Sequence, residues 1–194
     1  MRPVPHLMCW ALGLAAPQTQ TTAREREAVA RYAYRRSRIV EVGVWHGVTT
    51  AVLRAAMAPH GALWAVDPFP AGRLGFSPQR PIAKRSVARV SNGAVSWIRE
   101  TGQIAAERYK AEQLPPVDLV FLDGDHSYAV VMQDWDAWSP LVVMGGVICV
   151  HDSAATEYLP DCGSIQAVNE IVARDTRFER VEVVDTLTVL RRRA

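Results

Sequence analysis

The stretch Val117-Asp-Leu-Val-Phe-Leu-Asp-Gly-Asp-His-Ser-Tyr128, with the later Gly145-Gly-Val-Ile-Cys-Val-His-Asp152, decides the fold. Its two apolar runs, 117–122 and 147–150, are predicted to be buried strands, and the segment 127–143 between them is predicted to be a helix. Carboxylate and imidazole side chains follow both runs. Because the carboxyl ends of parallel strands lie along one edge of an α/β sheet, where ligands bind, these side chains are expected to meet there.

Strands alternate with helices along the rest of the chain. Further strands are predicted at 38–44, 62–67 and 94–99, and an antiparallel hairpin at 180–184 and 187–191 with Asp185-Thr186 as its turn. Helices are predicted at 23–34, where Thr22 and Glu25 form a capping box, and at 48–58, 81–91, 104–114 and 164–174. The pattern predicts an α/β fold with a doubly wound, mostly parallel seven-stranded sheet that ends in an antiparallel hairpin.

The composition indicates a globular chain of one main domain. It has 194 residues, of which 49% are hydrophobic and 22% are charged. A net charge of only +2 gives no nucleic-acid footprint, and no apolar run is long enough to cross a membrane. Three cysteines without close spacing favour a reducing, cytoplasmic location. Residues 22–194 are expected to form the domain.

Residues 1–21 are expected to form an N-terminal arm. The apolar run Leu7 to Ala16 has the length of a signal-peptide core, but Pro3 and Pro5 weaken the basic region that would precede it. A helix or arm that packs on the domain, or a lid, is the favoured interpretation, and a secretory signal is the alternative.

The loop Gly43-Val-Trp-His-Gly47 connects a strand to a helix. Glycine permits sharp turns and close approach to a ligand, but the loop lacks the middle glycine that admits a pyrophosphate in dinucleotide sites. A nucleoside cofactor without phosphates fits better. Glu41 could accept a hydrogen bond from a cationic amine, and Asp67, about 20 residues past the loop, could bind a ribose diol. Trp45 and His46 are expected to pack against neighbouring helices.

These motifs resemble those of the class I S-adenosylmethionine-dependent methyltransferases, which have a Rossmann-like fold. The segment from Asp123 to Tyr128, with the later Gly145-Gly-x-Ile-x-x-His-Asp152, is similar to the metal-dependent O-methyltransferases of antibiotic sugar and cephalosporin biosynthesis, and more distantly to catechol O-methyltransferase. The resemblance covers about Ile39 to Asp152. It implies an enzyme that transfers a methyl group to a hydroxyl oxygen of a small molecule, without nucleic-acid or membrane partners and possibly as a homodimer.

The resemblance also implies roles for single residues. Asp123, His151 and Asp152 would hold a divalent metal, with Mg²⁺ or Mn²⁺ as the expected ion. Asp123 and His126 would be catalytic, with His126 as the general base at a pKa near 6.5. The cofactor-binding residues would be Glu41, Gly43, Gly47, Thr49, Asp67 and Thr101.

One departure from the family pattern leaves alternatives open. His151 stands where relatives more often have an oxygen ligand, and imidazole suits manganese, iron or zinc better than magnesium. Three alternatives follow: a different metal, water in place of His151, or a metal-free site with His151 in acid–base work. For Asp125 the alternative to a site role is a cap on the next helix at Ser127.

Two other classes of function remain as alternatives, a nicotinamide-dependent oxidoreductase and a non-catalytic cofactor-binding protein. A nitrogen or carbon acceptor is a third alternative. The acceptor pocket is expected to be built from the N-terminal arm and the loop Pro68–Arg80, in which Arg73 and Arg80 could contact an anionic group.

Overall fold

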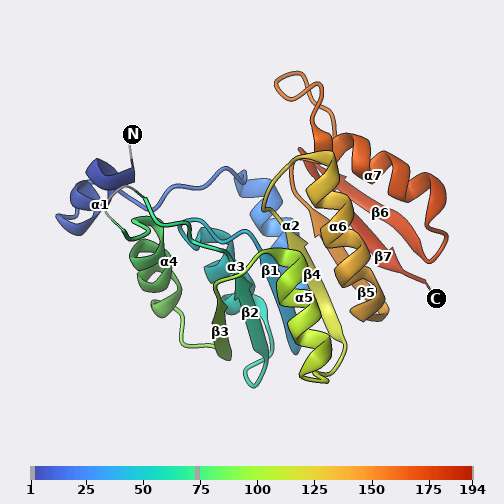
Figure 1. Ribbon diagram of the computed structural model, residues 1–194, viewed down its shortest axis with the longest axis horizontal. Helices are drawn as coiled ribbons and strands as arrows, with labels where there is room; N and C mark the ends of the chain where they lie inside the picture. Colours follow the sequence, from blue (N-terminus) through green and yellow to red (C-terminus); the bar gives the residue numbers. More distant parts are fainter. Residues whose placement is uncertain (1–2, 73–74, 194) are drawn as a thin grey trace.

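A seven-stranded sheet with helices on both faces forms the body of the protein in the computed structural model, which describes residues 3–72 and 75–193 (Figure 1). The strand order is β3-β2-β1-β4-β5-β7-β6. The strands are β1 (Arg38–Val42), β2 (Ala62–Val66), β3 (Ala94–Ile98), β4 (Val117–Leu122), β5 (Val142–Val150), β6 (Phe178–Val184) and β7 (Leu187–Arg192). The helices are α1 (Pro3–Ala11), α2 (Ala23–Ala33), α3 (Val48–Ala56), α4 (Gln79–Ala88), α5 (Gly102–Ala111), α6 (Tyr128–Trp138) and α7 (Gly163–Arg174), with a short 3₁₀ turn at Ser139–Leu141.

The sheet reverses its direction of growth between β1 and β4. From β1 the chain proceeds outward through β2 to β3, and it then returns to β4 on the other side of β1 and continues to β5. These five strands are parallel, whereas β7 pairs antiparallel with both β5 and β6. The predicted α/β class, parallel core and terminal hairpin are confirmed. The point of reversal opens a crevice beyond the carboxyl ends of β1 and β4.

Each face of the sheet buries its own apolar cluster, because alternate residues of a strand point to opposite faces. Val40 and Val120 pack on the face covered by α5, α6 and α7, whereas Ile39 and Leu119 pack under α2 and α3 (Figure 1). Trp138 is fully buried between α6 and the sheet. The predicted helical side containing Val131, Trp135 and Trp138 lies in this core.

The prediction for the segment between β4 and β5 was wrong in two respects. Helix α6 ends at Trp138 rather than at residue 143, because Ser139–Leu141, with Pro140 inside, tightens into a 3₁₀ turn. Strand β5 begins at Val142, so Gly145-Gly146 lies inside the strand rather than in a turn before it. The pairing of β5 with β4 shifts register at this place, and Gly145 has a φ of 73°.

The N-terminal arm contributes a helix of its own. Helix α1 lies at one end of the molecule, near α4 (Figure 1). Its His6 is buried, and the segment after it runs to Thr22, the N-cap of α2, where the predicted capping box with Glu25 is present. None of the helices in residues 3–72 and 75–193 is long and apolar enough to span a membrane. Arg73 lies outside the described residues.

Candidate active site

The tips of β1 and β4 touch at the point of sheet reversal. Gly43, at a φ of 92°, faces the backbone of Asp123 so closely that a Cβ on it would lie 2.0 Å from the Asp123 carbonyl oxygen. A cavity of about 570 Å³ opens over this contact. Seven of the predicted site residues line it: Glu41, Gly43, Thr49, Asp67, Thr101, Asp123 and His126. The structure therefore brings five of the six residues predicted to bind the cofactor to one cavity, together with Asp123 and His126.

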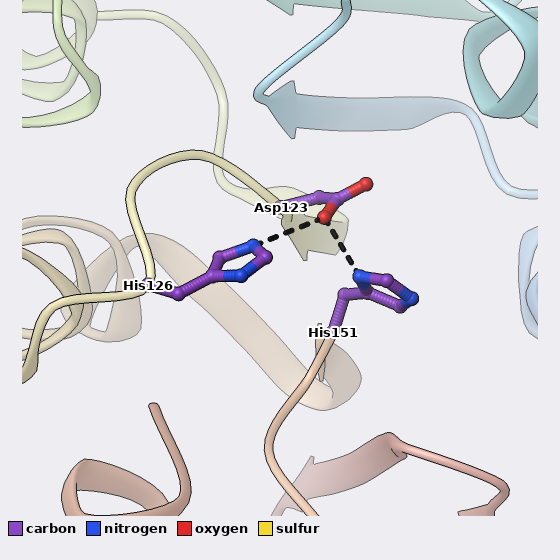
Figure 2. Close-up of side chains that lie close together, drawn as sticks. All are labelled: Asp123, His126 and His151. Atoms are coloured by element: carbon purple, nitrogen blue, oxygen red, sulfur yellow. Dashed lines mark ion pairs between the residues drawn. The ribbon is translucent and has the colours of Figure 1, made fainter. Parts of the chain in front are cut away.

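Three side chains at the tips of β4 and β5 converge on one point (Figure 2). Oδ1 of Asp123 lies 2.9 Å from Nδ1 of His151 and 3.4 Å from Nε2 of His126. His151 follows β5 directly and its side chain is 1% exposed, whereas that of His126, in the loop before α6, is 27% exposed. Only His126 of the two imidazoles lines the cavity.

Asp152 closes the cluster from the other side. Its Oδ2 lies 3.2 Å from Nδ1 of His126 and 3.6 Å from Nδ1 of His151, and its φ is 49°. Each imidazole thus lies between two carboxylates. For His126 these are the carboxylates of Asp123 and Asp152. These two carboxylates, Asp123 first, raise the pKa of His126 to about 10, well above the expected 6.5. Burial opposes the charge of His151, but Asp123 and Glu25 raise its pKa to about 10 as well.

The nitrogens that face Asp123 are poorly satisfied. Nε2 of His126 and Nδ1 of His151 are buried, and within the described residues neither has a hydrogen-bond partner. Charge attracts both nitrogens to Asp123, but neither is aligned with it for a hydrogen bond. The ligand atoms of Asp123, His126 and His151 lie within 4.8 Å of one another. One carboxylate oxygen and two imidazole nitrogens directed at a common point fit a transition-metal cation better than Mg²⁺.

Glu41 is the other unusual charge of the site. Its side chain is fully buried at the end of β1, and neither carboxylate oxygen has a hydrogen-bond partner in the described part of the chain. Burial, reinforced by the charges of Asp123 and Asp67, raises the pKa of Glu41 well above its usual range. A buried carboxyl group that faces a cavity without a partner fits a cationic or hydrogen-bond-donating ligand.

The other predicted cofactor residues mostly organise the loop around the cavity. The Asp67 carboxylate accepts hydrogen bonds from the backbone N–H groups of Val44, Trp45 and Phe69. The hydroxyl of Thr49 lies 3.4 Å from that of Thr21 in the arm. A Cβ on Gly47 would lie 2.9 Å from the Ala83 carbonyl oxygen of α4, so this glycine serves close packing and does not line the cavity.

The interpretation of His46 as a packing residue and of Asp125 as a capping residue agrees with the structure, whereas Trp45 lines the cavity. His46 stacks between Trp45 and His6 of α1, with ring centroids 4.7 and 5.0 Å away, and its Nδ1 accepts from the Gln18 N–H. Burial, with the nearby His6, lowers the pKa of His46 to about 4. Asp125 accepts from the Ser127 N–H at the start of α6.

Two buried acids of the site were not singled out from the sequence. Glu25 was interpreted only as a capping residue, yet its Oε2 lies 3.4 Å from Nε2 of His151. Asp134 lines the cavity opposite Thr101 and Gly102, and a Cβ on Gly102 would lie 2.3 Å from its Oδ1. Asp134 falls on the buried side of α6, three residues after Val131, so a carboxylate within that apolar periodicity was the available signal.

The Asp134→Asn substitution is expected to stabilise the ligand-free protein in a pH-dependent way. Burial, with the charge of Asp125, raises the pKa of Asp134 from 3.8 to about 6. Its contribution to stability is therefore present below pH 3.8 and is lost as pH rises through about 6. Urea unfolding should give a free energy about 2 kcal/mol higher for the variant at about pH 8, and a much smaller gain at about pH 4.

The matched control is Asp136→Asn, an exposed acid on the same helix, which should change stability by less than about 0.5 kcal/mol at either pH. An equal gain from Asp134→Asn at both pH values would contradict the assignment of a raised pKa to this carboxyl group.

The sheet order, the antiparallel C-terminal pair and the site at the β1–β4 crevice define a Rossmann-like, class I methyltransferase fold. The chain belongs to the methyltransferase-domain family, whose description, "Methyltransferase domain", is matched by residues 40–153. No curated protein sequence matches the chain significantly.

Solved structures of methyltransferases resemble the whole chain at low sequence identity. An O-methyltransferase from Bacillus cereus in complex with SAH is 15% identical, with a TM-score of 0.65 over 99% of this chain and 91% of that chain. TomG, an O-methyltransferase of tomaymycin synthesis from Streptomyces achromogenes, in complex with SAM, is 17% identical, with a TM-score of 0.70 over 100% and 91%. A putative rRNA methylase from Clostridium thermocellum is 13% identical, with a TM-score of 0.62 over 91% and 99%.

Proposed function

We propose that the protein is an S-adenosylmethionine-dependent methyltransferase that methylates a hydroxyl oxygen of a small molecule with the help of a divalent cation. One observation carries the proposal: the buried Glu41 carboxyl group, which has no hydrogen-bond partner among residues 3–72 and 75–193, and the Asp123–His126 cluster face the same cavity at the point of sheet reversal. Membership of the methyltransferase-domain family supports the reaction class.

The cavity offers complementary groups for each part of S-adenosylmethionine. Glu41 would accept from the amino group of the methionine part, and Asp67, already oriented by three backbone N–H groups, would accept from the ribose hydroxyls. Asp134, beside Thr101, would accept from the exocyclic amine of the adenine. When bound, S-adenosylmethionine supplies an electrophilic methyl group on a positively charged sulfur.

The donor atoms at the tips of β4 and β5 would hold the cation. Asp123 and His151 would be two of the ligands, and the third would be either Asp152 or His126. A divalent cation held there would offset the carboxylate charges that keep His126 protonated, and it would polarise the acceptor hydroxyl group. The imidazole of His151 favours Mn²⁺, Fe²⁺ or Zn²⁺ over Mg²⁺ in this proposal.

His126 is the group positioned to receive the acceptor's proton. It lines the cavity, whereas His151 is enclosed, and its far nitrogen lies 3.2 Å from Asp152, which would stabilise the resulting imidazolium. In the reaction the acceptor oxygen gains the methyl carbon and loses its proton, while the sulfur retains the electron pair of the broken C–S bond. Acceptance of the proton requires His126 to be neutral beforehand, against the raised pKa that its two carboxylates impose.

The acceptor would enter beside the N-terminal arm. Gln18, Thr19 and Gln20 of the arm line the cavity together with Phe69 and Pro70 of the 68–80 loop. Amides and hydroxyls facing an aromatic ring suit a small molecule with hydroxyl groups and some apolar surface. The two similar O-methyltransferases support oxygen as the acceptor atom, and the similar putative rRNA methylase is the reason to test a nucleic acid in parallel.

The Glu41→Gln substitution tests the cofactor assignment. It removes the negative charge opposite the methionine amine, and the affinity for S-adenosylmethionine is expected to fall by roughly 30- to 100-fold in calorimetric titration. The ligand-free protein should gain stability, because an unpaired buried acid is replaced by a neutral side chain.

The control Glu107→Gln, an exposed acid on α5, should leave the affinity unchanged. Tight binding of a nicotinamide dinucleotide in place of S-adenosylmethionine would replace the proposed reaction by hydride transfer.

A further inference from the structure

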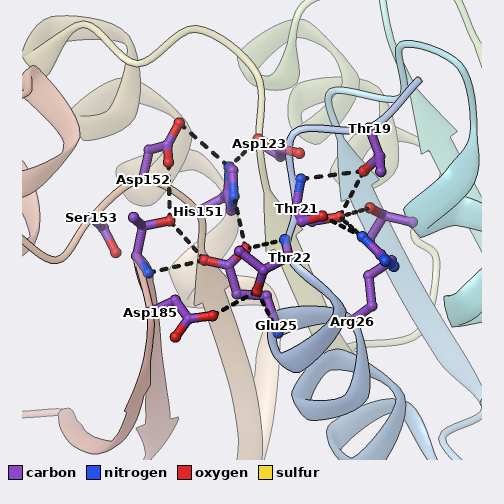
Figure 3. A network of polar contacts seen from close by, with 12 residues as sticks. Thr19, Thr21, Thr22, Glu25, Arg26, Asp123, His151, Asp152, Ser153 and Asp185 are labelled. Atoms are coloured by element: carbon purple, nitrogen blue, oxygen red, sulfur yellow. Dashed lines mark hydrogen bonds and ion pairs between the residues drawn. The ribbon is translucent and has the colours of Figure 1, made fainter. Parts of the chain in front are cut away.

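Glu25 is a fully buried acid in the first turn of α2, and its carboxylate accepts hydrogen bonds from Thr22 and Thr186 beside His151 (Figure 3). Its Oε2 accepts from the Thr22 N–H at 2.7 Å. Its Oε1 accepts from the N–H and the hydroxyl of Thr186, at 2.9 and 2.7 Å, in the turn between β6 and β7. Two backbone N–H groups and one hydroxyl thus surround a single buried carboxylate, an arrangement that favours its charged form.

The anion lies directly behind His151. Oε2 of Glu25 is 3.4 Å from Nε2 of His151, and on the opposite side of the ring Nδ1 is 2.9 Å from Oδ1 of Asp123. The side chains of Glu25 and His151 are both 1% exposed, so water does not compete for either atom. The ring is therefore held between an acid inside the protein and the acid of the site.

We propose that Glu25 is a positioning residue for His151: it holds a proton on Nε2 and so leaves Nδ1 as the atom directed at Asp123 and the candidate metal. The argument for the metal rests on the proposed function, whereas the argument for the proton rests on the contacts of Glu25 alone.

The donors around Glu25 determine which nitrogen of the His151 ring carries the proton. The anion accepts from two backbone N–H groups and one hydroxyl and donates nothing, so a Nε2 lone pair facing Oε2 would place two acceptors 3.4 Å apart inside the protein. A proton on Nε2 removes this repulsion. A carboxylate behind a histidine fixes its tautomer and increases the basicity of the other nitrogen, as at many metal sites.

Thr186 connects this acid to the other carboxylate of the site. Its hydroxyl lies 2.7 Å from Oε1 of Glu25 and 3.0 Å from Oδ1 of Asp152. The β6–β7 turn is itself tied to α2, because Thr22 and Arg24 donate to Asp185 at 2.7 and 2.6 Å. The hairpin and the start of α2 thus form a frame that keeps Glu25 in place behind His151.

The test compares Glu25→Gln with Thr22→Ala. Glutamine still suits the third position of a capping box. Its amide, however, has only one acceptor oxygen, so the NH₂ group must face one of the N–H donors that the second carboxylate oxygen accepts from in the wild type. Thr22→Ala removes the cap hydroxyl and its hydrogen bond to Asp185, at a cost of about 1 kcal/mol. The Arg24–Asp185 pair and the hydrogen bond from the Thr22 N–H to Glu25 remain, so the Glu25–His151 contact is expected to persist. Mn²⁺ affinity, measured by electron paramagnetic resonance, should fall about 10- to 100-fold in Glu25→Gln and should not change in Thr22→Ala.

A double-mutant cycle separates positioning from general destabilisation. In a His151→Asn background, Glu25→Gln should cause no further loss of Mn²⁺ affinity, because the residue through which Glu25 acts is absent. An additional loss there, or a similar loss in Thr22→Ala, would overturn the proposal in favour of a purely structural role.

Nitrogen NMR of the metal-free protein gives an independent result. At a pH above about 10, where the pKa of His151 leaves the ring with a single proton, the nitrogen signals should place that proton on Nε2 in the wild type and should show it shared with Nδ1 in Glu25→Gln. A bare Nε2 in the wild type would overturn the inference even if Mn²⁺ binds. If the wild type binds no Mn²⁺, the metal part of the proposed function fails, and the NMR result still decides where Glu25 holds the proton.

Discussion

Asp123→Asn is expected to lower kcat by about 10³-fold while the affinity for S-adenosylmethionine changes by less than about threefold. Oδ1 of Asp123 is the atom on which the cluster converges, since it faces His126 at 3.4 Å and His151 at 2.9 Å. An asparagine has one neutral oxygen in place of two charged ones, so it weakens the cation site and removes the electrostatic restraint on both rings.

The Asp123→Asn substitution leaves the backbone contacts of residue 123 unchanged. Its N–H donates to the Val42 carbonyl, and this contact and the approach of Gly43 do not depend on the side chain. The fold and the cofactor cavity should therefore persist in the variant. Turnover would be followed by formation of S-adenosylhomocysteine with a panel of hydroxylated acceptors, and cofactor affinity by calorimetry.

Asp125→Asn is the matched control, because Asp125 lies two residues away, at the same strand tip and also on the cavity wall, and its carboxylate caps α6 through the Ser127 N–H. Its kcat should stay within about threefold of the wild type, since asparagine is also a good cap. A comparable loss of turnover in both variants would contradict the special role of Asp123, and full activity of the wild type after removal of metal by a chelator would contradict the cation.

Gly43→Ala is expected to destabilise the protein by more than about 3 kcal/mol and to abolish cofactor binding. The new Cβ would lie 2.0 Å from the carbonyl oxygen of Asp123 and 2.7 Å from the N of Gly124, so the backbones of β1 and β4 would have to separate. The φ of 92° adds strain, because a side chain rarely adopts it. Thermal unfolding and cofactor titration measure the two losses.

Gly145→Ala distinguishes the backbone strain of a positive φ from the steric clash of the new Cβ. Gly145 also has a positive φ, 73°, but a Cβ there would meet no atom within 4 Å among the described residues. This control should cost only about 1 kcal/mol and should leave cofactor affinity unchanged. Equal destabilisation by the two substitutions would show that the backbone angle, rather than contact between the strand tips, is what requires glycine at position 43.

The regular alternation of strands and helices was sufficient to predict the fold. The apolar runs of β1, β2 and β4 and the turn at Asp185-Thr186 have local signals, and right-handed βαβ connections place the tips of the parallel strands along one edge. The cluster at Asp123, His126 and His151 was accessible for the same reason, because strand tips of a parallel sheet share one edge. The start of β5 at Val142 was missed, because Gly145-Gly146 has the local signature of a turn.

The electrostatics of the site could not be predicted from local sequence. The pKa of His126 depends on Asp152, and the environment of His151 depends on Glu25, which is 126 positions earlier in the chain and carries an unremarkable capping motif. No periodicity of the sequence relates these residues. Glu25 is brought to His151 by the packing of α2 against the β6–β7 turn. Likewise, the role of Asp134 appears only when α6 is placed beside the start of α5.

The contact between Glu25 and Thr186 joins residues 161 positions apart, so the surroundings of His151 depend on a hairpin that is synthesised after the five parallel strands. A chain that has left the ribosome only as far as residue 152 already contains Asp123, His126, His151 and Asp152, but Glu25 has no Thr186 to hold it. The arrangement of His151 would then be completed only after the β6–β7 hairpin has been made, and activity during refolding would report the docking of this hairpin rather than the collapse of the parallel core.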